Sequence, residues 1–410
     1  MRDRQALRHV SKHWHESAQG ERQSIKEWPV GPCQRGLSEI KEEVAREGSL
    51  DSLRGIAALD VVLSHALVFA SATLPLLSPW IRFTPLRLFG QARSAVIFFF
   101  VLSGYVLALQ LLRQRLTYSR YLVRRFCRIY LPFAVSILTA GVLIAAIGNR
   151  AQPHFPPTMT DWRDGSFAAI VQHLIMTGLR ADIQMNGVVW SLIHEMRVSL
   201  IMPLLVAAMA RAPVRACLSL VAMSGLAFAV LAHLGEQQGL YDARTVWSSL
   251  LMTVYFVAPF AIGVFAAVKR DELLSWFAAH PLLAWIVPIV GISSLHFGIG
   301  TFVFDLVNSL AGAWIILAVL ANPRVKDALE HSWFVWLGKV SYSLYLFHLL
   351  VFLSLVNLFG DSIPTLPLVG LAIAVSLGAA EVMNRIVERP ADALGKRLTR
   401  NKLHASVATA

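Results

Sequence analysis

Ten apolar runs of about 20 residues each dominate this 410-residue sequence. A helix of about 20 apolar residues spans a bilayer and satisfies its own backbone hydrogen bonds there. The runs therefore predict transmembrane helices at residues 53–74, 91–112, 128–148, 187–210, 214–234, 245–268, 280–298, 301–321, 336–358 and 364–386. Pro281 and Pro288 interrupt the seventh run. The sequence predicts an all-α polytopic membrane protein with about ten helices in one bundle.

Composition separates the chain from soluble proteins. It is 56% hydrophobic and 15% charged, whereas a soluble domain carries about 25% charged residues. The net charge of +12 lies mainly in the loops and termini, so we interpret it as a topology signal and expect no nucleic-acid partner. The three cysteines are scattered, and the 13 histidines form no cluster with ligand spacing. We expect neither a disulfide nor a metal site.

The distribution of lysine and arginine predicts how the bundle is oriented. Basic residues alternate between a rich and a poor side, as an even number of spans requires, and the rich side is cytoplasmic. Both termini are therefore expected in the cytoplasm. Residues 1–48 would form a partly disordered tail, 49–390 the transmembrane domain and 391–410 a basic tail. Loop 149–186 would lie outside, and its apolar segment 167–179 is too short to cross the membrane.

The first span contains Arg54, Asp60 and His65. Ionisable groups at membrane depth are costly and usually face the bundle interior or a wet cavity. Arg54 and His65 are separated by three helical turns, so they share one face and lie about 16 Å apart along the axis. This arrangement suits a site that holds an anion at one end and moves a proton at the other. The alternative is that His65 is a packed, hydrogen-bonded core residue.

Glu195 and His348 lie in other spans at a similar predicted depth. Counting residues from the predicted membrane edges places each of them, like His65, roughly 18 Å from the cytoplasmic side. Because each group would be costly in contact with lipid, we predict that the three share one polar cavity. For the neighbouring His194 and Arg197, the favoured interpretation is pairing with Glu195 or with the backbone.

Arginines and small residues form two further patterns. Arg125 and Arg128 share a helix face at the start of the third span. Such a pair can bind phosphates and, with Arg54, would form a cytoplasmic anion site, although a topology signal alone also explains it. Ser103 and Gly104 in the second span favour close helix packing. The alternative is that this face lines an entry for an acyl chain.

Five motifs in this order resemble the membrane-bound acyltransferase 3 family. They are LDSLRGIAALDVVLSH, FFFVLSGYVLA, RRFCRIYLP, WSLIHE and SYSLYLFHLLV, and the resemblance covers about residues 50–390. It implies ten transmembrane helices and a cytoplasmic acyl-CoA donor. It also implies transfer of an acetyl or short acyl group to a hydroxyl of a cell-envelope saccharide or lipid-linked glycan, in a bacterial-type inner membrane. The resemblance associates Arg54 and His65 with catalysis, and Arg125 and Arg128 with donor binding.

These observations lead to one mechanistic hypothesis. His65 is predicted as the general base, Glu195 as the group that orients the imidazole or the acceptor, and Arg54 as a further catalytic or donor-binding cation. Residues predicted to contact substrate are Trp190, Ser191, Tyr345, His348 and Ser103. No cofactor is expected to be permanently bound, because acyl-CoA, most simply acetyl-CoA, is the donor substrate.

Two alternatives stay open at this point. His65 could relay the acyl group across the membrane instead of activating the acceptor. The chain could also be a transporter or flippase of an envelope precursor, since intramembrane His, Glu and Arg suit proton coupling. The residues that follow Glu195, Met196-Arg197-Val198-Ser199, depart from the Gln-Phe-Tyr-like pattern of many family members and leave the acceptor open.

Overall fold

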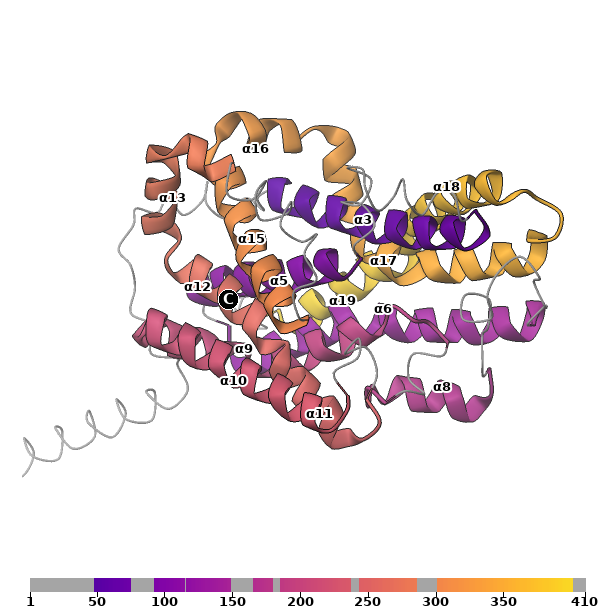
Figure 1. The fold of residues 1–410 in the computed structure, drawn as a ribbon, viewed down its shortest axis with the longest axis horizontal. Helices are drawn as coiled ribbons and strands as arrows, with labels where there is room; N and C mark the ends of the chain where they lie inside the picture. Colours follow the sequence, from indigo (N-terminus) through magenta and orange to yellow (C-terminus); the bar gives the residue numbers. More distant parts are fainter. Residues whose placement is uncertain are drawn as a thin grey trace, which may run out of the picture.

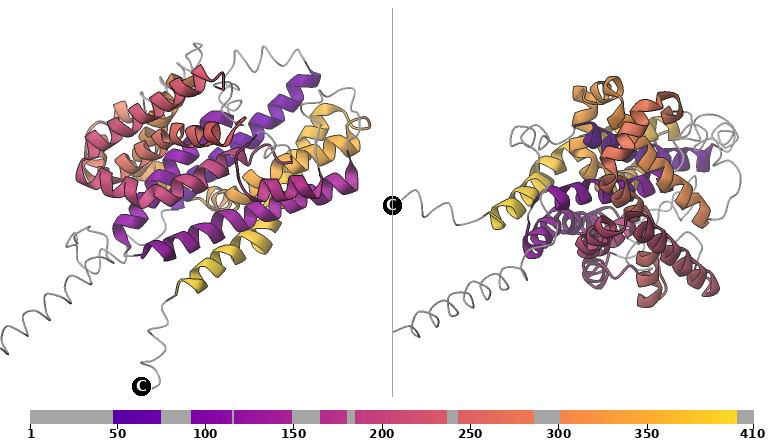
Figure 2. Two further views of the ribbon diagram at one scale, coloured as in Figure 1. Left: turned by 90° about the horizontal axis from the view of Figure 1, so that it is seen from below. Right: turned by 90° about the vertical axis from the view of Figure 1, so that its left-hand side faces the viewer.

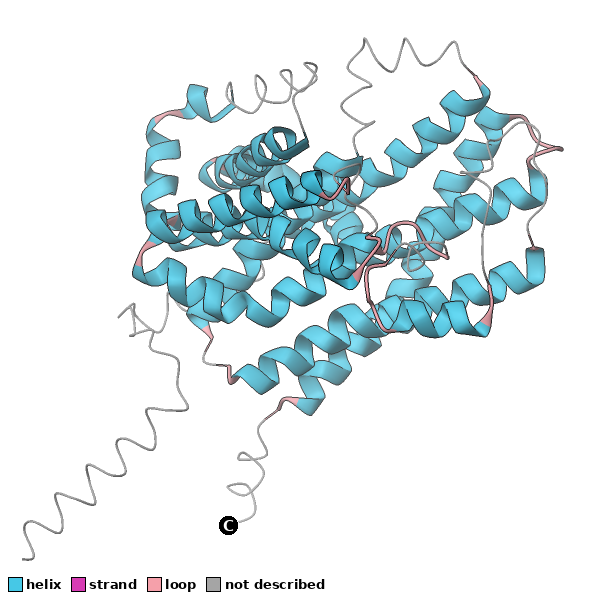
Figure 3. Ribbon diagram, turned by 60° about the horizontal axis from the view of Figure 1, so that its bottom comes forward, coloured by secondary structure: helices cyan, strands magenta, loops and turns pink. Residues whose placement is uncertain are grey.

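The computed structural model describes residues 48–74, 92–114, 116–148, 165–179, 185–236, 243–285 and 301–400. Nearly all of these residues are helical (Figure 3). No strand occurs among them, and one isolated β-bridge joins Leu179 to Ala243. The predicted all-α fold class is confirmed.

Nine helical segments in the described ranges are long and apolar enough to cross a membrane. They form one bundle (Figure 1). The segments are α3 (Gly48–Thr73), α5 (Ala92–Arg113), α6 (Tyr118–Ile147), α9 (Trp190–Arg211), α10 (Pro213–His233), α11 (Val246–Tyr255) continued by α12 (Val257–Val268), α15 (Thr301–Ala321), α17 (Ser332–Phe359), and α18 (Thr365–Met383) with its continuation. Nine of the ten predicted spans are therefore confirmed, and the seventh, 280–298, lies outside the described residues beyond residue 285.

Shorter helices complete the described part of the chain. They are α8 (Phe167–Leu174), α13 (Arg270–Ala279), α16 (Pro323–Leu329), the π-helical turn η3 (Asn384–Glu388) and α19 (Arg389–Leu398). Helix α8 falls in the apolar segment predicted to be too short to cross, and its eight residues confirm that prediction. Residues 1–47 and 401–410 lie outside the described residues, so the predicted tails and their cytoplasmic location stay predictions.

The chain remains helical past residue 390, where the basic tail was predicted to begin. Helix α19 packs on the first half of α6 (Figure 2). Arg124 donates from Nε to Thr399 Oγ1 at 2.8 Å, and Gly395 lies against Cys127, where a larger residue would crowd α6. The first eight residues of the predicted tail therefore belong to the folded domain.

Helix α6 begins ten residues earlier than predicted. The span was predicted from residue 128, but the helix starts at Tyr118 and continues for 30 residues. The prediction was wrong because charged residues lower the hydropathy of this stretch, whereas arginine can bury its aliphatic stem and pair its guanidinium inside a bundle. Arg125 and Arg128 consequently project from a helix, and about two to three turns of α6 precede them on the side predicted to be cytoplasmic.

Helices α3 and α17 are parallel neighbours in the bundle. Gly55 lies against Gly338, and ten residues later on both helices His65 contacts His348. Equal spacing on both helices means that they run in the same direction over about 15 Å. A Cβ on Gly55 or Gly338 would overlap the backbone of the other helix. Gly104 similarly lies against the Phe260 carbonyl of α12, which confirms its predicted role in close helix packing.

The α3–α17 crossing gives a first testable prediction. We expect Gly338→Ala to destabilise the protein by about 1–3 kcal/mol, since the added methyl overlaps the Asp51 carbonyl and forces the helices apart. Gly370→Ala on α18 is the matched control, because no atom lies within 4 Å of its added Cβ. Thermal unfolding of both variants in detergent measures the difference. Equal melting temperatures would contradict the close crossing.

Candidate active site

His65 and His348 form the polar centre of the α3–α17 contact. His65 Nδ1 lies 3.1 Å from His348 Nε2, and the ring centroids are 5.1 Å apart. His65 Nδ1 also lies 3.0 Å from the Val61 carbonyl, and His348 Nδ1 lies 3.0 Å from the Leu344 carbonyl. His348 is fully buried, whereas His65 is partly exposed. The structure thus brings together two residues that the depth estimate predicted to share a cavity.

Tyr345 connects this pair to the start of α9. Its ring lies beside that of His348, with centroids 6.3 Å apart. The Tyr345 hydroxyl lies 2.7 Å from Ser191 Oγ and donates to the Val188 carbonyl at 2.8 Å. Ser191, predicted as a substrate contact, is buried in this contact. The hydroxyl pair therefore ties the α9 N-terminus to α17, one helical turn from His348.

Glu195 lies one turn further along α9 and has its own set of partners. Its Oε1 accepts hydrogen bonds from Ser103 Oγ and Arg125 Nη2, both at 3.1 Å. Arg125 also donates to Ser199 Oγ at 3.0 Å, and only 9% of this arginine is exposed. Helices α5, α6 and α9 thus meet at one buried ion pair.

Glu195 was predicted to orient either the His65 imidazole or the acceptor, and the first of these contacts does not occur among the described residues. In the described part of the chain, His65 Nδ1 is hydrogen-bonded to Val61 and His348, and the Glu195 carboxylate to Ser103 and Arg125. One connection between the two groups runs through α9, Ser191 and Tyr345. Depth along the membrane normal was predicted from residue counts, but the rotation of α9 about its axis was not.

The predicted donor-binding arginines lie in different surroundings. Arg54 pairs with Asp51 at 2.9 Å. Arg125 is occupied by Glu195. Arg128 is half-buried and makes no hydrogen bond or ion pair with the residues that the structure describes. Binding of a donor by these three residues stays a prediction.

Tyr342 and Glu388 are residues that the sequence analysis missed. The Tyr342 hydroxyl donates to the Ile129 carbonyl at 2.8 Å, and it lies within range of the charges of Arg125, Arg128, Glu195 and Glu388. Glu388 comes from the π-helical turn η3 and accepts hydrogen bonds from Ser343 and Asn384. Single π-helical turns often occur at functional sites. No sequence pattern signals such a turn, and Glu388 falls just beyond the predicted span 364–386.

Trp190 is placed differently from its predicted role. It is 6% exposed and packs against Phe100 and Phe256, with ring centroids 6.4 and 5.5 Å away. These contacts make it part of the aromatic core between α5, α9 and the α11–α12 junction. Contact of Trp190 with a substrate stays a prediction.

Arg197 was predicted to pair with Glu195 or with the backbone and bonds the backbone, whereas the side-chain partner of His194 is a threonine hydroxyl. His194 Nδ1 lies 2.9 Å from Thr253 Oγ1. Arg197 donates to the Thr177 carbonyl at 2.6 Å and to the Ser249 carbonyl at 3.1 Å. These bonds fix the segment before residue 180 and helix α11 against α9.

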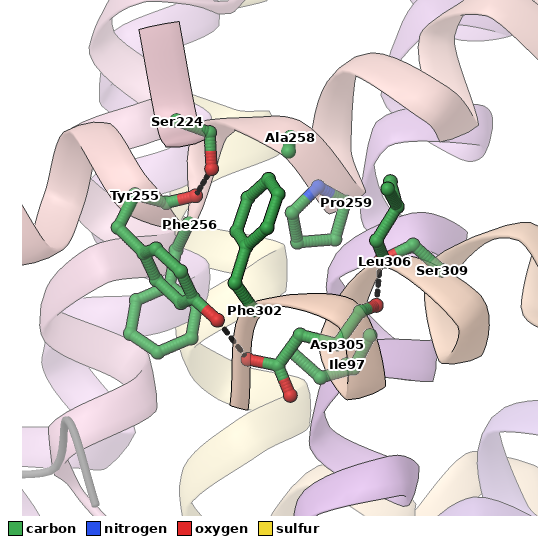
Figure 4. A pocket seen from close by; sticks show the side chains of 10 residues that line it. All are labelled: Ile97, Ser224, Tyr255, Phe256, Ala258, Pro259, Phe302, Asp305, Leu306 and Ser309. Carbon is green, nitrogen blue, oxygen red and sulfur yellow. Dashed lines mark hydrogen bonds between the residues drawn. The ribbon is translucent and has the colours of Figure 1, made fainter. Parts of the chain in front are cut away.

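A second buried polar network lies between α5, α11 and α15. Arg93 donates to both carboxylate oxygens of Asp305, at 2.8 and 2.6 Å, and the Tyr255 hydroxyl donates to the same carboxylate at 2.6 Å. Figure 4 shows the Tyr255–Asp305 contact beside a small cavity lined mainly by apolar side chains. Asp305 is fully engaged by these partners, so the network holds helices together. Within the described ranges, no group of three His, Cys, Asp or Glu side chains could hold a metal ion.

The fold and this polar centre define a polytopic helical membrane protein with paired histidines and a buried Arg–Glu pair inside its bundle. A family model described as an acyltransferase domain matches residues 47–383. The chain therefore belongs to the membrane acyltransferase 3 family and is an acyltransferase. No curated protein and no solved structure matches it.

Proposed function

We propose that this protein transfers an acetyl or short acyl group from cytoplasmic acyl-CoA to a hydroxyl of a cell-envelope saccharide or lipid-linked glycan. The observation that carries the proposal is the partly exposed His65 imidazole, held by a buried His348, inside an acyltransferase domain. A general base of this kind must reach the proton that it removes. The proposed location is a bacterial-type inner membrane.

In the proposed reaction the acceptor hydroxyl gives its proton to His65 as its oxygen attacks the thioester carbonyl. The carbon–sulfur bond then breaks, and the coenzyme A thiolate leaves. The proton on His65 passes to this thiolate, so the products are an ester and free coenzyme A. Tyr345 is the proposed donor to the developing oxyanion, and it must release the Val188 carbonyl to act, because its hydroxyl carries a single proton.

Donor binding is assigned to the arginines of α3 and α6. Coenzyme A carries phosphates, which arginine binds strongly through its planar fork of donors. Arg128 is the first choice for this role, since Arg125 is engaged by Glu195 whereas Arg128 makes no hydrogen bond or ion pair with the described residues. Arg54, beside Asp51 near the start of α3, is the proposed second cation.

Arg128 provides a test of donor binding. We expect Arg128→Ala to raise KM for acyl-CoA by about tenfold or more with little change in kcat, because one charge-assisted bond to phosphate contributes about 1.5–3 kcal/mol. Arg215→Ala on α10 is the control, since that arginine is exposed and makes no contact with the polar centre. An unchanged KM in Arg128→Ala would remove this residue from the donor site.

The experiment that tests the function uses purified full-length protein in lipid nanodiscs. Labelled acetyl-CoA is supplied with a panel of envelope saccharides and lipid-linked glycans, and ester formation and free coenzyme A are both measured. We expect stoichiometric release of coenzyme A with at least one acceptor. Movement of a precursor across a proteoliposome membrane, with no acyl transfer from any acyl-CoA, would instead support a transporter.

A further inference from the structure

We infer that His348 is the positioning residue of this site: together with the Val61 carbonyl, it holds the His65 imidazole in the tautomer that carries its proton on Nδ1 and leaves Nε2 as the free base. The inference rests on the proposed function, since it assigns how the general base is prepared. It replaces the predicted role of Glu195 as the group that orients the imidazole.

His348 is the buried end of the chain of hydrogen bonds, and its own tautomer is determined by the backbone. A carbonyl oxygen can only accept, so His348 Nδ1, 3.0 Å from the Leu344 carbonyl, must carry a proton. Neutral imidazole carries one proton, which leaves His348 Nε2 as an acceptor. A charged His348 would be a fully buried cation, and the described residues place no carboxylate on it. Burial of an uncompensated charge is costly, so His348 is neutral.

The protonation of His348 determines the tautomer of His65. Its Nδ1 faces two acceptors, the Val61 carbonyl at 3.0 Å and His348 Nε2 at 3.1 Å. It must therefore be the donor to both. The remaining ring nitrogen, Nε2, holds the lone pair of the neutral imidazole and has no hydrogen-bond partner among the described residues. Because His65 is partly exposed whereas His348 is not, Nε2 is the nitrogen left for a substrate proton.

This arrangement also operates after the proton has been taken up. When His65 becomes an imidazolium, its Nδ1–H remains directed at the Nε2 lone pair of His348, which stabilises the positive charge. A carboxylate does this work in the Ser-His-Asp triad. Here a neutral imidazole serves instead, itself anchored by a backbone carbonyl, in the manner in which outer hydrogen bonds fix the tautomer of metal-bound histidine.

Ring nitrogen NMR tests the tautomer without any reaction. In protein labelled with ¹⁵N at histidine, we expect His65 Nδ1 to be protonated and Nε2 bare, with the signals assigned by their loss in His65→Ala. In His348→Leu only the Val61 carbonyl still accepts from Nδ1, so the tautomer protonated at Nδ1 should lose part of its population. A resting His65 protonated at Nε2 in the parent protein would overturn the inference, whether or not the protein transfers acyl groups.

Kinetics of two substitutions complete the test. We expect His348→Leu to lower kcat roughly 10- to 100-fold with an unchanged KM for acyl-CoA. His348→Gln should recover most of this loss, because its amide oxygen can accept from His65 Nδ1. Asn357→Leu, another buried polar residue on α17, should alter thermal stability but not the His65 signals. Equal kcat in the Gln and Leu variants would overturn the positioning role.

Discussion

Acyl transfer will be abolished in His65→Ala, with a loss of about 100- to 10,000-fold in kcat, the range expected for removal of a general base. The imidazole is the partly exposed member of the histidine pair, and alanine leaves no group that could take the acceptor proton. Donor binding should survive, since the arginines proposed for it are distant in the chain. Arg54 lies three helical turns from His65 on α3, and Arg128 belongs to another helix, α6. Labelled acetyl transfer and calorimetric titration with coenzyme A measure the two quantities separately.

The control for this variant is His280→Ala. His280 follows α13, is exposed, and its Nδ1 contacts only its own helix at the Trp276 carbonyl, 2.9 Å away. Its loss should leave kcat and coenzyme A binding unchanged. Transfer by His65→Ala within a few-fold of the parent rate would eliminate His65 as the base. Loss of coenzyme A binding together with activity would indicate that the substitution disturbs the whole site.

The sequence predicted that His65 and His348 lie near one another, in a cavity shared with Glu195, because depth in the membrane depends on few unknowns. Residue counts from the membrane edge place His65 and His348 at the same depth, and both residues are too polar to face lipid. The structure adds the reason for their contact, which is the glycine crossing of Gly55 and Gly338 ten residues earlier on each helix. Two parallel helices held that closely bring equal positions together along their length.

Glu195 illustrates what residue counting cannot provide. Its depth was predicted, but a helix can present a residue at a given depth to any of its neighbours. Ser191 is directed to Tyr345 on α17, whereas Glu195, one turn later, is directed to α5 and α6. The choice depends on the position of Arg125, 70 residues away, and therefore on tertiary packing.

Other parts of the site had no local signal at all. Asp305 lies in an apolar run and Arg93 at the edge of another, 212 residues apart, and only the folded bundle joins them. Glu388 depends on the π-helical turn η3, which one extra residue in a helical turn creates and which hydrophobic periodicity does not reveal. Long-range pairs and local helix defects are therefore the features that required a structure.

The Arg125–Glu195 pair should be the most sensitive point of the bundle to single substitutions. Its two side chains are only 11% and 22% exposed. Removal of one partner leaves the other as a buried, uncompensated charge, which typically costs about 3–5 kcal/mol. We therefore expect both Arg125→Ala and Glu195→Ala to lower the unfolding temperature in detergent sharply and to reduce kcat. The exposed pair of Lys269 and Glu272 is the control, where removal of either charge should change stability by at most about 1 kcal/mol.

Replacing both partners separates the contribution of the pair to stability from its contribution to the reaction. In Arg125→Leu/Glu195→Leu no charge is left unpaired, so most of the stability lost in the single variants should return. Acyl transfer should remain low, because neither the carboxylate nor its contact with Ser103 is restored. The coupling energy follows from the double-mutant cycle of the unfolding free energies. If Arg125→Ala instead only raises KM for acyl-CoA, with unfolding unchanged, then Arg125 binds the donor directly, as the sequence motif implied, and the observed ion pair is not what holds α6 to α9.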